Sequence, residues 1–307
     1  MDKKHIFYDN TKKQFLENDI FHKENLSILK QKAGTYRLIC LDLDHTLLRN
    51  DGTISDFSRT ILEKAARNHI HVVIASGRPF QALPPEVLSL SGLQYIITSN
   101  GAVLQKLHPF SRMRHFCLSS ESLMSLVRDF KKYFPIEVFM DGQGYAEERY
   151  IENPVAFGAK PSHIPYIRST RLPVNDMEAF TLKHGGEIES LDIIVPDDKV
   201  NRYLRDTIAL SYPEVHVTSS TTHLVEISSK DAGKENQLKY LAQHLHISMQ
   251  QCISFGDGDN DADMLQACGL GIAMENASEG AKKAAAFVTS SNEADGVAAA
   301  LNLILFS

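Results

Sequence analysis

Runs of apolar residues, rather than an alternation of apolar and polar ones, mark the first strands that the sequence predicts. Such runs begin at Leu38, His71 and Tyr95, and nearly every position in them is apolar. A strand of this kind is buried on both faces, which is typical of the centre of a parallel sheet. A helix is expected between the first two, beginning at Ser55 or Asp56. Because strands and helices alternate, the pattern predicts an α/β fold with right-handed crossovers.

The pattern changes near residue 105. From about Phe116 to Thr222 the chain shows helical periodicity first and strand-like alternation afterwards. A hairpin is expected over 136–145, and half-buried strands are expected at 191–195 and 214–217. The proline-rich stretch 153–173 is assigned to no element. This block has the character of an inserted α+β domain.

The α/β pattern returns near Leu224. Residues 225–227 and 252–255 are strand-like, and a helix is expected over about 234–245. Shorter strands are expected at 270–273 and 287–288. The predicted domains are therefore an N-terminal extension (1–34), a core (35–115 and 223–307) and an inserted domain (116–222). We interpret the extension, which contains a loosely amphipathic stretch from Thr11 to Lys32, as a surface segment; a partner-binding or dimerising helix is the alternative.

Composition narrows the class of protein. The chain has 307 residues, is 43% hydrophobic and 23% charged, and carries a net charge of −6, which is ordinary for a soluble globular protein. The sequence contains no basic block interleaved with aromatic residues, which argues against nucleic acid as the main partner. No apolar run reaches the length of a membrane span. The N-terminus leads into polar sequence rather than a signal peptide. The four cysteines show no metal-binding spacing and predict buried thiols in a reducing compartment. We expect a cytoplasmic protein, either a monomer or a homodimer.

Candidate chemistry lies where the buried strands end. Asp42 and Asp44 follow the first strand, Ser76 and Gly77 the second, and the acid-rich stretch 256–261 follows the strand at 252–255. Open α/β sheets keep their ligands at the carboxyl ends of strands. A hard cation such as Mg²⁺ takes a few carboxylates together with water and substrate phosphate, and we expect Asp42 and Asp257 to supply carboxylates.

A phosphate site is predicted beside these acids. The hydroxyl of Ser76 and the amide of Gly77, at an expected helix N-terminus, suit a phosphate group. A cation to balance that phosphate could come from Lys234 or Lys230. These parts fit phosphoryl transfer, which depends mostly on positioning and electrostatic stabilisation.

Each part also has an ordinary explanation. Paired aspartates at a strand end are often a solvated loop, Ser76-Gly77 alone is a turn, and a single lysine is usually on the surface. Residues 256–261 could form a calcium-binding loop, but the glutamate at the twelfth position of an EF-hand is missing. Because all the parts occur in order, each after a buried strand, their joint occurrence by chance is improbable.

The ordered motifs resemble those of the haloacid dehalogenase superfamily, and specifically its Cof-type branch (subfamily IIB, with a C2B-type cap). The matching motifs are Asp42-Leu43-Asp44-His45-Thr46-Leu47, Ser76, Lys234 behind Glu226-Ile227, and Gly256-Asp257-Gly258-Asp259-Asn260-Asp261 followed by Met264-Leu265. The resemblance spans about residues 36–305. It implies a Rossmann-like core with a parallel sheet and an inserted α+β cap over 116–222. His45 and Glu235 stand where the family usually has glycine.

The resemblance also implies roles for single residues. Asp42 would be the nucleophile that forms an aspartyl-phosphate, and Asp44 the general acid and base. Mg²⁺ would be held by Asp42, the Asp44 backbone carbonyl and Asp257, with Asp261 in support. The phosphate-binding residues would be Ser76, Gly77, Lys234 and Asn260.

The predicted activity is Mg²⁺-dependent hydrolysis of a small phosphorylated metabolite, such as a sugar, nucleotide-like or cofactor phosphate. A phosphomutase and a non-catalytic phospho-ligand sensor are the alternatives. The sequence names no specificity residue in the cap; the polar and aromatic candidates there are Tyr145, Tyr150, His163, Arg168 and His184.

Overall fold

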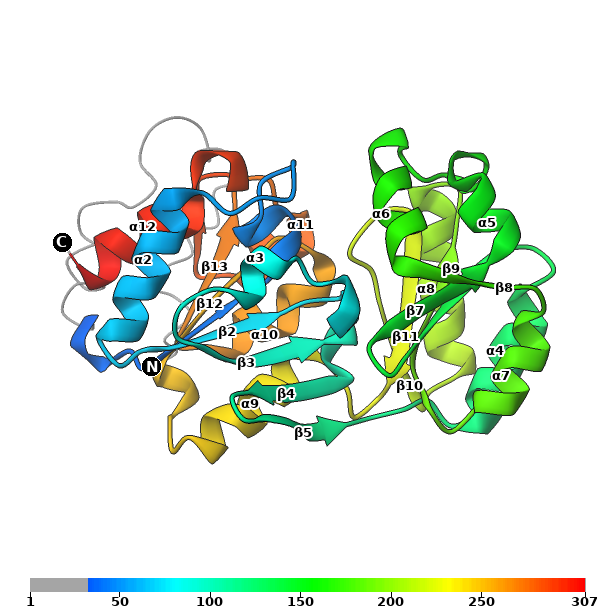
Figure 1. Cartoon of the computed structure of the whole chain (residues 1–307), viewed down its shortest axis with the longest axis horizontal. Helices are drawn as coiled ribbons and strands as arrows, with labels where there is room; N and C mark the ends of the chain where they lie inside the picture. Colours follow the sequence, from blue (N-terminus) through cyan, green and yellow to red (C-terminus); the bar gives the residue numbers. More distant parts are fainter. Residues whose placement is uncertain (1–32, 307) are drawn as a thin grey trace.

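The computed structural model describes residues 33–306, so the predicted helix within the N-terminal extension lies outside the described residues. The chain forms two lobes, each built on its own sheet (Figure 1). The first sheet has eight strands in the order β14-β13-β12-β1-β2-β3-β4-β5. Their bounds are β1 Leu38–Leu41, β2 His71–Ala75, β3 Leu93–Thr98, β4 Val103–Leu107, β5 Phe110–His115, β12 Cys252–Gly256, β13 Leu270–Met274 and β14 Phe287–Thr289.

The core sheet is parallel from β14 to β3, as the apolar runs predict, and ends in an antiparallel hairpin of β4 and β5. Every position of β1 is buried because helices cover both faces of the sheet. Apolar side chains of α2 and α12 pack on one face, and those of α9 and α10 pack on the other. The core helices are α2 Asp56–Arg67, α3 Pro85–Leu88, α9 Lys234–His244, α10 Ala262–Ala267, α11 Glu279–Ala284 and α12 Gly296–Leu305. The Ser55 hydroxyl caps α2 by accepting a hydrogen bond from Ser58 N, as predicted.

The second lobe is the inserted domain. Its six-stranded sheet has the order β10-β11-β9-β6-β7-β8 and is antiparallel except for the β7–β8 pair. The strands are β6 Ile136–Met140, β7 Gln143–Glu147, β8 Arg171–Val174, β9 Ile188–Ile194, β10 Val215–Thr218 and β11 Leu224–Ser229. The helices are α4 Ser120–Phe130, α5 Glu148–Glu152, α6 Ile164–Thr170, α7 Met177–His184 and α8 Asp198–Ser211.

Two expectations for this lobe need correction. The return to the core was predicted at residue 223, but β11 pairs with β9 and β10 and so belongs to the inserted sheet. The chain re-enters the core only at α9. The strand at 191–195 was expected to be half buried, yet β9 is buried at every position because it lies inside the sheet with both faces covered.

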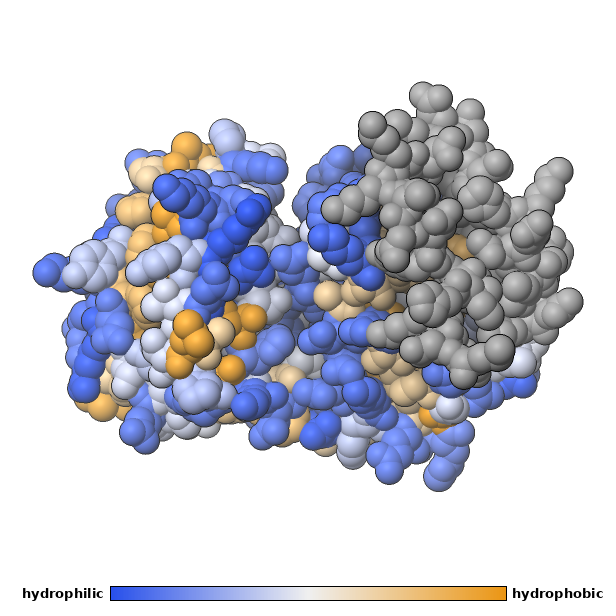
Figure 2. All heavy atoms as spheres, turned by 180° about the vertical axis from the view of Figure 1, so that it is seen from behind, coloured by the Kyte–Doolittle hydropathy of each residue, from blue (hydrophilic) through white to orange (hydrophobic). Residues whose placement is uncertain are grey.

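The two faces of the inserted sheet differ in chemistry. One face is apolar and packs against α4 and α8, with Val138, Leu191 and Ile227 in register across three strands. The other face carries Glu137 and Asp192, and part of it, including Ala146 and Ile194, packs under Tyr150 and Ile167 of α5 and α6. The inserted sheet also contacts the core, where Ser99 Oγ donates to Glu189 at 2.8 Å. In Figure 2 the lobes are separated at the top by a notch that hydrophilic residues border.

Cys40, Cys252 and Cys268 are buried, as expected, whereas Cys117 is partly exposed, and all four thiols are free. Between residues 33 and 306, the structure contains no helix of the length and hydrophobicity that crossing a membrane requires.

A buried ion pair on the face that carries Glu137 gives a stability prediction. Arg171 donates to both carboxylate oxygens of Glu137, at 2.7 and 3.1 Å, and both side chains are almost inaccessible to solvent. Arg171→Met leaves the Glu137 charge buried without its partner, and we expect it to lower the free energy of unfolding by roughly 3–5 kcal/mol. Arg112→Met, which removes a solvent-exposed pair with Asp141, should cost less than about 1 kcal/mol. Urea denaturation measures both, and equal losses would contradict the prediction.

Candidate active site

The acids at the strand ends converge as the fold predicts. β1 lies between β12 and β2, so Asp42 and Asp257 leave neighbouring strands on the same edge of the sheet. The Asp42 amide donates to the Phe255 carbonyl at 3.0 Å and thereby continues the β1–β12 pairing. One carboxylate oxygen from each of Asp42, Asp257 and Asp261 lies within 4.8 Å of the others. The result is a compact cluster of three acids, of which Asp42 and Asp261 are buried.

Lys234, the first residue of α9, holds two of these acids. Its Nζ donates to Asp42 Oδ1 at 2.6 Å and to Asp261 Oδ1 at 2.7 Å, and the lysine is only 2% exposed. Burial alone would lower the pKa of Lys234, but the charges of Asp261 and Asp42 outweigh it and raise the pKa. The lysine is therefore protonated. Lys230, the alternative cation, instead donates to the Pro213 carbonyl at the surface.

Burial governs the protonation of the cluster. Desolvation raises the pKa of Asp42 well above its usual range, although the charge of Lys234 opposes this effect. Burial and the negative charge of Asp261 raise the pKa of Asp257 to about 7, against a hydrogen bond from Thr46 Oγ1 at 3.0 Å. Three carboxylates facing one ammonium leave an excess of negative charge, which a divalent cation would balance.

Asp261 is fixed on both sides. Its Oδ1 accepts from Lys234, and its Oδ2 accepts from the backbone amides of Asp257 and Gly258, both at 3.0 Å. Since these bonds occupy both oxygens, Asp261 orients the loop after β12 and the lysine rather than facing an open space. Asp257 and Asp42 are left as the more available carboxylates.

Asp44 lies apart from the cluster. Arg78 donates hydrogen bonds from two nitrogens to the Asp44 carboxylate, at 2.6 and 2.8 Å. The Asp44 side chain is 46% exposed. The guanidinium of Arg78 in turn stacks 4.6 Å from the ring centroid of Tyr166 in the inserted domain. The spacing of Asp42 and Asp44 thus sends one carboxylate inward and the other toward the second lobe.

His45 occupies a left-handed backbone position with φ 57°, and this explains why glycine is common there in the family. Histidine is among the residues that tolerate this region. The exposed ring lies 3.3 Å from Asn50 Oδ1, and the His45 carbonyl accepts from Asn276. The side chain therefore does not enter the acid cluster.

Ser76 and Gly77 follow β2, Asn260 lies in the acid-rich loop after β12, and Asn100 after β3 contacts both segments. Ser76 is buried, and its Oγ accepts from Arg78 N at 3.1 Å. A side chain at Gly77 would meet Asn100 at 3.1 Å, and Asn260 donates to Asn100 Oδ1 at 3.0 Å. The expected helix N-terminus at Ser76 is wrong: a bend follows, the first helical turn is the 3-10 helix Phe80–Ala82, and the short α3 begins at Pro85.

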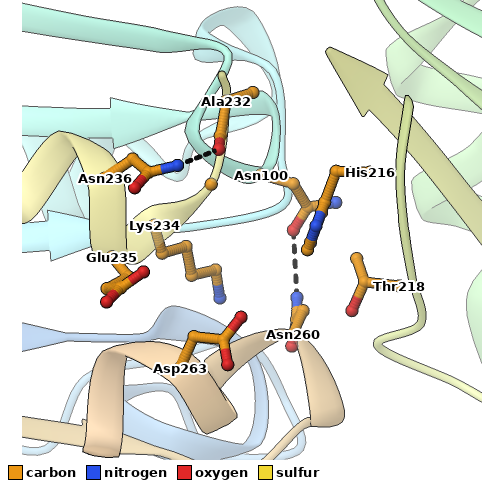
Figure 3. A pocket seen from close by; sticks show the side chains of 10 residues that line it. Asn100, His216, Thr218, Ala232, Lys234, Glu235, Asn236, Asn260 and Asp263 are labelled. Carbon is orange, nitrogen blue, oxygen red and sulfur yellow. Dashed lines mark hydrogen bonds between the residues drawn. The ribbon is translucent and has the colours of Figure 1, made fainter. Parts of the chain in front are cut away.

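A cavity of about 60 Å³ adjoins Lys234. Figure 3 shows that Asn100, Lys234 and Asn260 from the core face His216 and Thr218 from β10 across it. Burial lowers the pKa of His216, which favours the neutral imidazole. The inserted domain therefore forms one wall of the space beside the predicted phosphate site, and residues of both lobes enclose it.

Sequence reasoning gave no role to Arg78, Asn100 and Tyr166, all of which border the site. Arg78 and Asn100 directly follow strand ends, a signal that could have found them, whereas nothing in the pattern marks Tyr166. The cap candidates are mostly structural: Tyr145 and His184 pack on Phe180, Tyr150 is buried, and Arg168 binds backbone carbonyls. Of the five, His163 lies close enough to Asp44 and His45 to interact with their charges.

The site and fold have counterparts in known proteins. A family model described as haloacid dehalogenase-like hydrolase matches residues 39–301. The chain belongs to this family. It is 26% identical to a phosphatase of Bacillus subtilis, covering 85% of this chain and 97% of the relative. It is 27% identical to a 5-amino-6-(5-phospho-D-ribitylamino)uracil phosphatase of the same organism, with 86% and 94% coverage.

A solved haloacid dehalogenase-like hydrolase from B. subtilis superposes with a TM-score of 0.76 at 25% identity, covering 87% of this chain and 99% of that one. The resemblance read from the motifs and the predicted fold class are confirmed. The chain is an enzyme of the phosphatase kind within this hydrolase family.

Lys234→Met tests the ion cluster. The variant leaves Asp42 and Asp261 buried without a cation, so we expect the free energy of unfolding at pH 8 to fall by roughly 3–5 kcal/mol. In the variant, the folded-state pKa values of these acids rise above their unfolded values, so the lost stability returns as the pH falls and they become protonated. Urea denaturation at pH 5 and pH 8 measures this.

Lys239→Met is the matched control, because Lys239 lies on the same helix in an exposed pair with Glu235. We expect it to cost less than about 0.5 kcal/mol at either pH. A Lys234→Met loss that matches the control, or that does not shrink at low pH, would show that the cluster does not depend on the lysine.

Proposed function

We propose that the protein is a Mg²⁺-dependent phosphomonoesterase that acts on a small phosphorylated metabolite through an aspartyl-phosphate on Asp42. The observation that carries the proposal is the buried Asp42 carboxylate, held at the end of β1 by Lys234 and placed beside Asp257. A carboxylate in this setting is oriented and partly desolvated, as a nucleophile requires. The name of the relative that acts on a phosphorylated ribitylamino compound supports a small-molecule substrate.

The donor set suits Mg²⁺. Hard carboxylate oxygens converge within 4.8 Å, and Mg²⁺ typically takes one or two carboxylates while keeping waters and substrate oxygens. We assign Asp42, the Asp44 backbone carbonyl and Asp257 as ligands, with Asp261 in the supporting role that its two occupied oxygens favour. When bound, the ion would offset the negative charge of the phosphate and of the acids.

In the first step, Asp42 attacks the phosphorus atom. Lys234 binds Oδ1, so we assign the attack to Oδ2. Lys234, Ser76, the Gly77 amide and Asn260 would bind the phosphate oxygens and stabilise the charge that develops on them. Asp44 would protonate the leaving-group oxygen and then take a proton from the water that hydrolyses the acyl phosphate. Arg78 holds the Asp44 carboxylate in place with hydrogen bonds from two of its nitrogens.

Replacement of the nucleophile tests the proposal. With the full-length chain and p-nitrophenyl phosphate, Asp42→Asn should lower kcat/KM by at least about 1,000-fold, because the amide cannot form the intermediate. Asp51→Asn, a change at an exposed aspartate nearby in the sequence, should stay within about twofold of the unaltered protein. Chelation of divalent cations should abolish turnover, and added Mg²⁺ should restore it.

Undiminished hydrolysis by Asp42→Asn would remove Asp42 as the nucleophile. The products separate the alternatives within the family: inorganic phosphate identifies a phosphatase, whereas an isomerised ester without net phosphate release identifies a phosphomutase. Binding of phosphate esters with no turnover would indicate the non-catalytic sensor.

A further inference from the structure

Every nitrogen of the Arg78 guanidinium donates a hydrogen bond. Nε and Nη2 donate to the two carboxylate oxygens of Asp44, at 2.8 and 2.6 Å, and Nη1 donates to the Ala82 carbonyl at 3.0 Å. The Arg78 backbone amide donates to Ser76 Oγ, so both ends of the residue are held. Because the guanidinium is planar and rigid, three bonds from three nitrogens fix its position and its plane. The Arg78 side chain is also only 17% exposed, so water has little access to these bonds.

The inserted domain contributes the next contact. The ring of Tyr166, in α6, lies against the Arg78 guanidinium, with 4.6 Å between the ring centroid and Cζ. The same ring lies 5.2 Å from Cζ of Arg171, and the Tyr166 hydroxyl accepts from Arg171 Nη1 at 3.5 Å. Arg171 is itself fixed by Glu137. An aromatic ring attracts a cation over its face, so Tyr166 joins the arginine that holds Asp44 to a buried ion pair of the inserted domain.

The Asp44 carboxylate depends on Arg78 for its orientation. Its side chain is 46% exposed, and among residues 33–306 only Arg78 donates hydrogen bonds to the carboxylate. A half-exposed aspartate without a partner would move among several rotamers. A carboxylate can accept about four hydrogen bonds, and Arg78 takes one position on each oxygen. The remaining positions stay open, so Asp44 is held and can still exchange a proton.

Orientation matters because of the step that the proposed reaction assigns to Asp44. As Asp42 attacks and the phosphorus–oxygen bond of the ester breaks, the proton on Asp44 passes to the leaving oxygen. The water that later attacks the acyl phosphate returns a proton to Asp44. Proton transfer requires the two oxygens to lie within hydrogen-bond distance, and a misplacement of about 1 Å can cost about 100-fold in rate. Contacts that fix this carboxylate therefore act on the chemical step.

We infer that Arg78 and Tyr166 are positioning residues for Asp44. Arg78 orients the carboxylate that exchanges the proton, and Tyr166 keeps the Arg78 guanidinium in place from the inserted domain. The inference rests on the proposed phosphatase function and adds two residues to it. It gives the inserted domain a part in the chemical step that is separate from contact with the substrate.

Two aryl esters of similar shape test the inference with the full-length protein in the presence of Mg²⁺. Phenol is as weak an acid as a tyrosine side chain, so phenyl phosphate needs a proton donor for its leaving oxygen, whereas the more acidic p-nitrophenol leaves readily as its anion. Tyr166→Leu should lower kcat/KM for phenyl phosphate by about tenfold and that for p-nitrophenyl phosphate by no more than about threefold. Loss of a contact between Tyr166 and the leaving group would instead affect both esters alike.

Conservative changes and matched controls separate positioning from folding. Tyr166→Phe keeps the ring and should lose no more than about threefold with either ester. Arg78→Lys keeps the charge but loses the planar fork; it should lower kcat/KM for phenyl phosphate by about 100-fold and that for the p-nitrophenyl ester by less than about tenfold. The controls are Tyr203→Leu, at an exposed tyrosine of α8, and Arg112→Lys, in the exposed pair with Asp141. Neither control should change either ester by more than about twofold.

A double-mutant cycle shows whether the two residues act through Asp44. In an Asp44→Asn background the carboxylate that they orient is gone. Adding Tyr166→Leu or Arg78→Lys to it should therefore cause no further change in the ratio of the two kcat/KM values. A further loss confined to phenyl phosphate would show that these residues act on the substrate directly, and that result overturns the inference.

The outcomes separate this inference from the proposed function. Hydrolysis of both esters, with equal losses for both in Tyr166→Leu and Arg78→Lys, leaves the phosphatase activity in place and rejects the positioning role. Hydrolysis of neither ester by the unaltered protein rejects the proposed function, and the inference with it. Where Tyr166→Leu does not fold, the ratio of the two esters in Arg78→Lys decides.

Discussion

The bonds from one buried ammonium group to two carboxylates tie the parts of this molecule together. Lys234 joins α9 to the end of β1 through Asp42 and to the loop after β12 through Asp261. These three segments lie far apart in the chain, and the inserted domain separates the first from the others. Because a buried charge is tolerated only with partners, the pair of bonds fixes α9 against the sheet edge. The same contacts give the Asp42 carboxylate its orientation.

The second lobe also contains a buried charge that is held by a partner of opposite sign. Its sheet is buried on both sides; one side is apolar, and the other combines an apolar patch under α5 and α6 with buried charged residues. The second side keeps Arg171 on Glu137 and extends toward the core through Tyr166, which lies between Arg171 and Arg78. The contact between the lobes is therefore rich in charged side chains. A substrate that enters there would replace part of its hydration shell with contacts to these side chains. In the proposed reaction, the first sheet supplies the residues for the phosphate chemistry and the second lobe contacts the rest of the substrate.

Much of the core could be predicted because its signals are local. A largely apolar run followed by acids, as at β1 and β12, defines both the strand and the edge at which its polar residues meet. Sheet membership is not local: the alternation in β11 fits either domain, and only pairing with β9 excludes the core. The choice between Lys230 and Lys234 likewise required knowing how α9 begins. The alignment of Glu137, Asp192 and Glu226 on neighbouring strands was not visible in the sequence, because an isolated acid within a strand usually indicates a solvent-facing position and only the register brings the three together.

The connections between the lobes have a mechanical consequence. Residues 116–119 link β5 to α4, and residues 230–233 link β11 to α9; each link spans less than about 20 Å even when extended. Both lie near the lower edge in Figure 1, whereas α6, which carries Tyr166, lies at the upper edge. We therefore expect any separation of the lobes to pivot about these two links, the second of which ends directly before Lys234. The gap would widen most at the Tyr166–Arg78 contact, next to the already half-exposed Asp44, and least beside the buried Lys234 and its two acids.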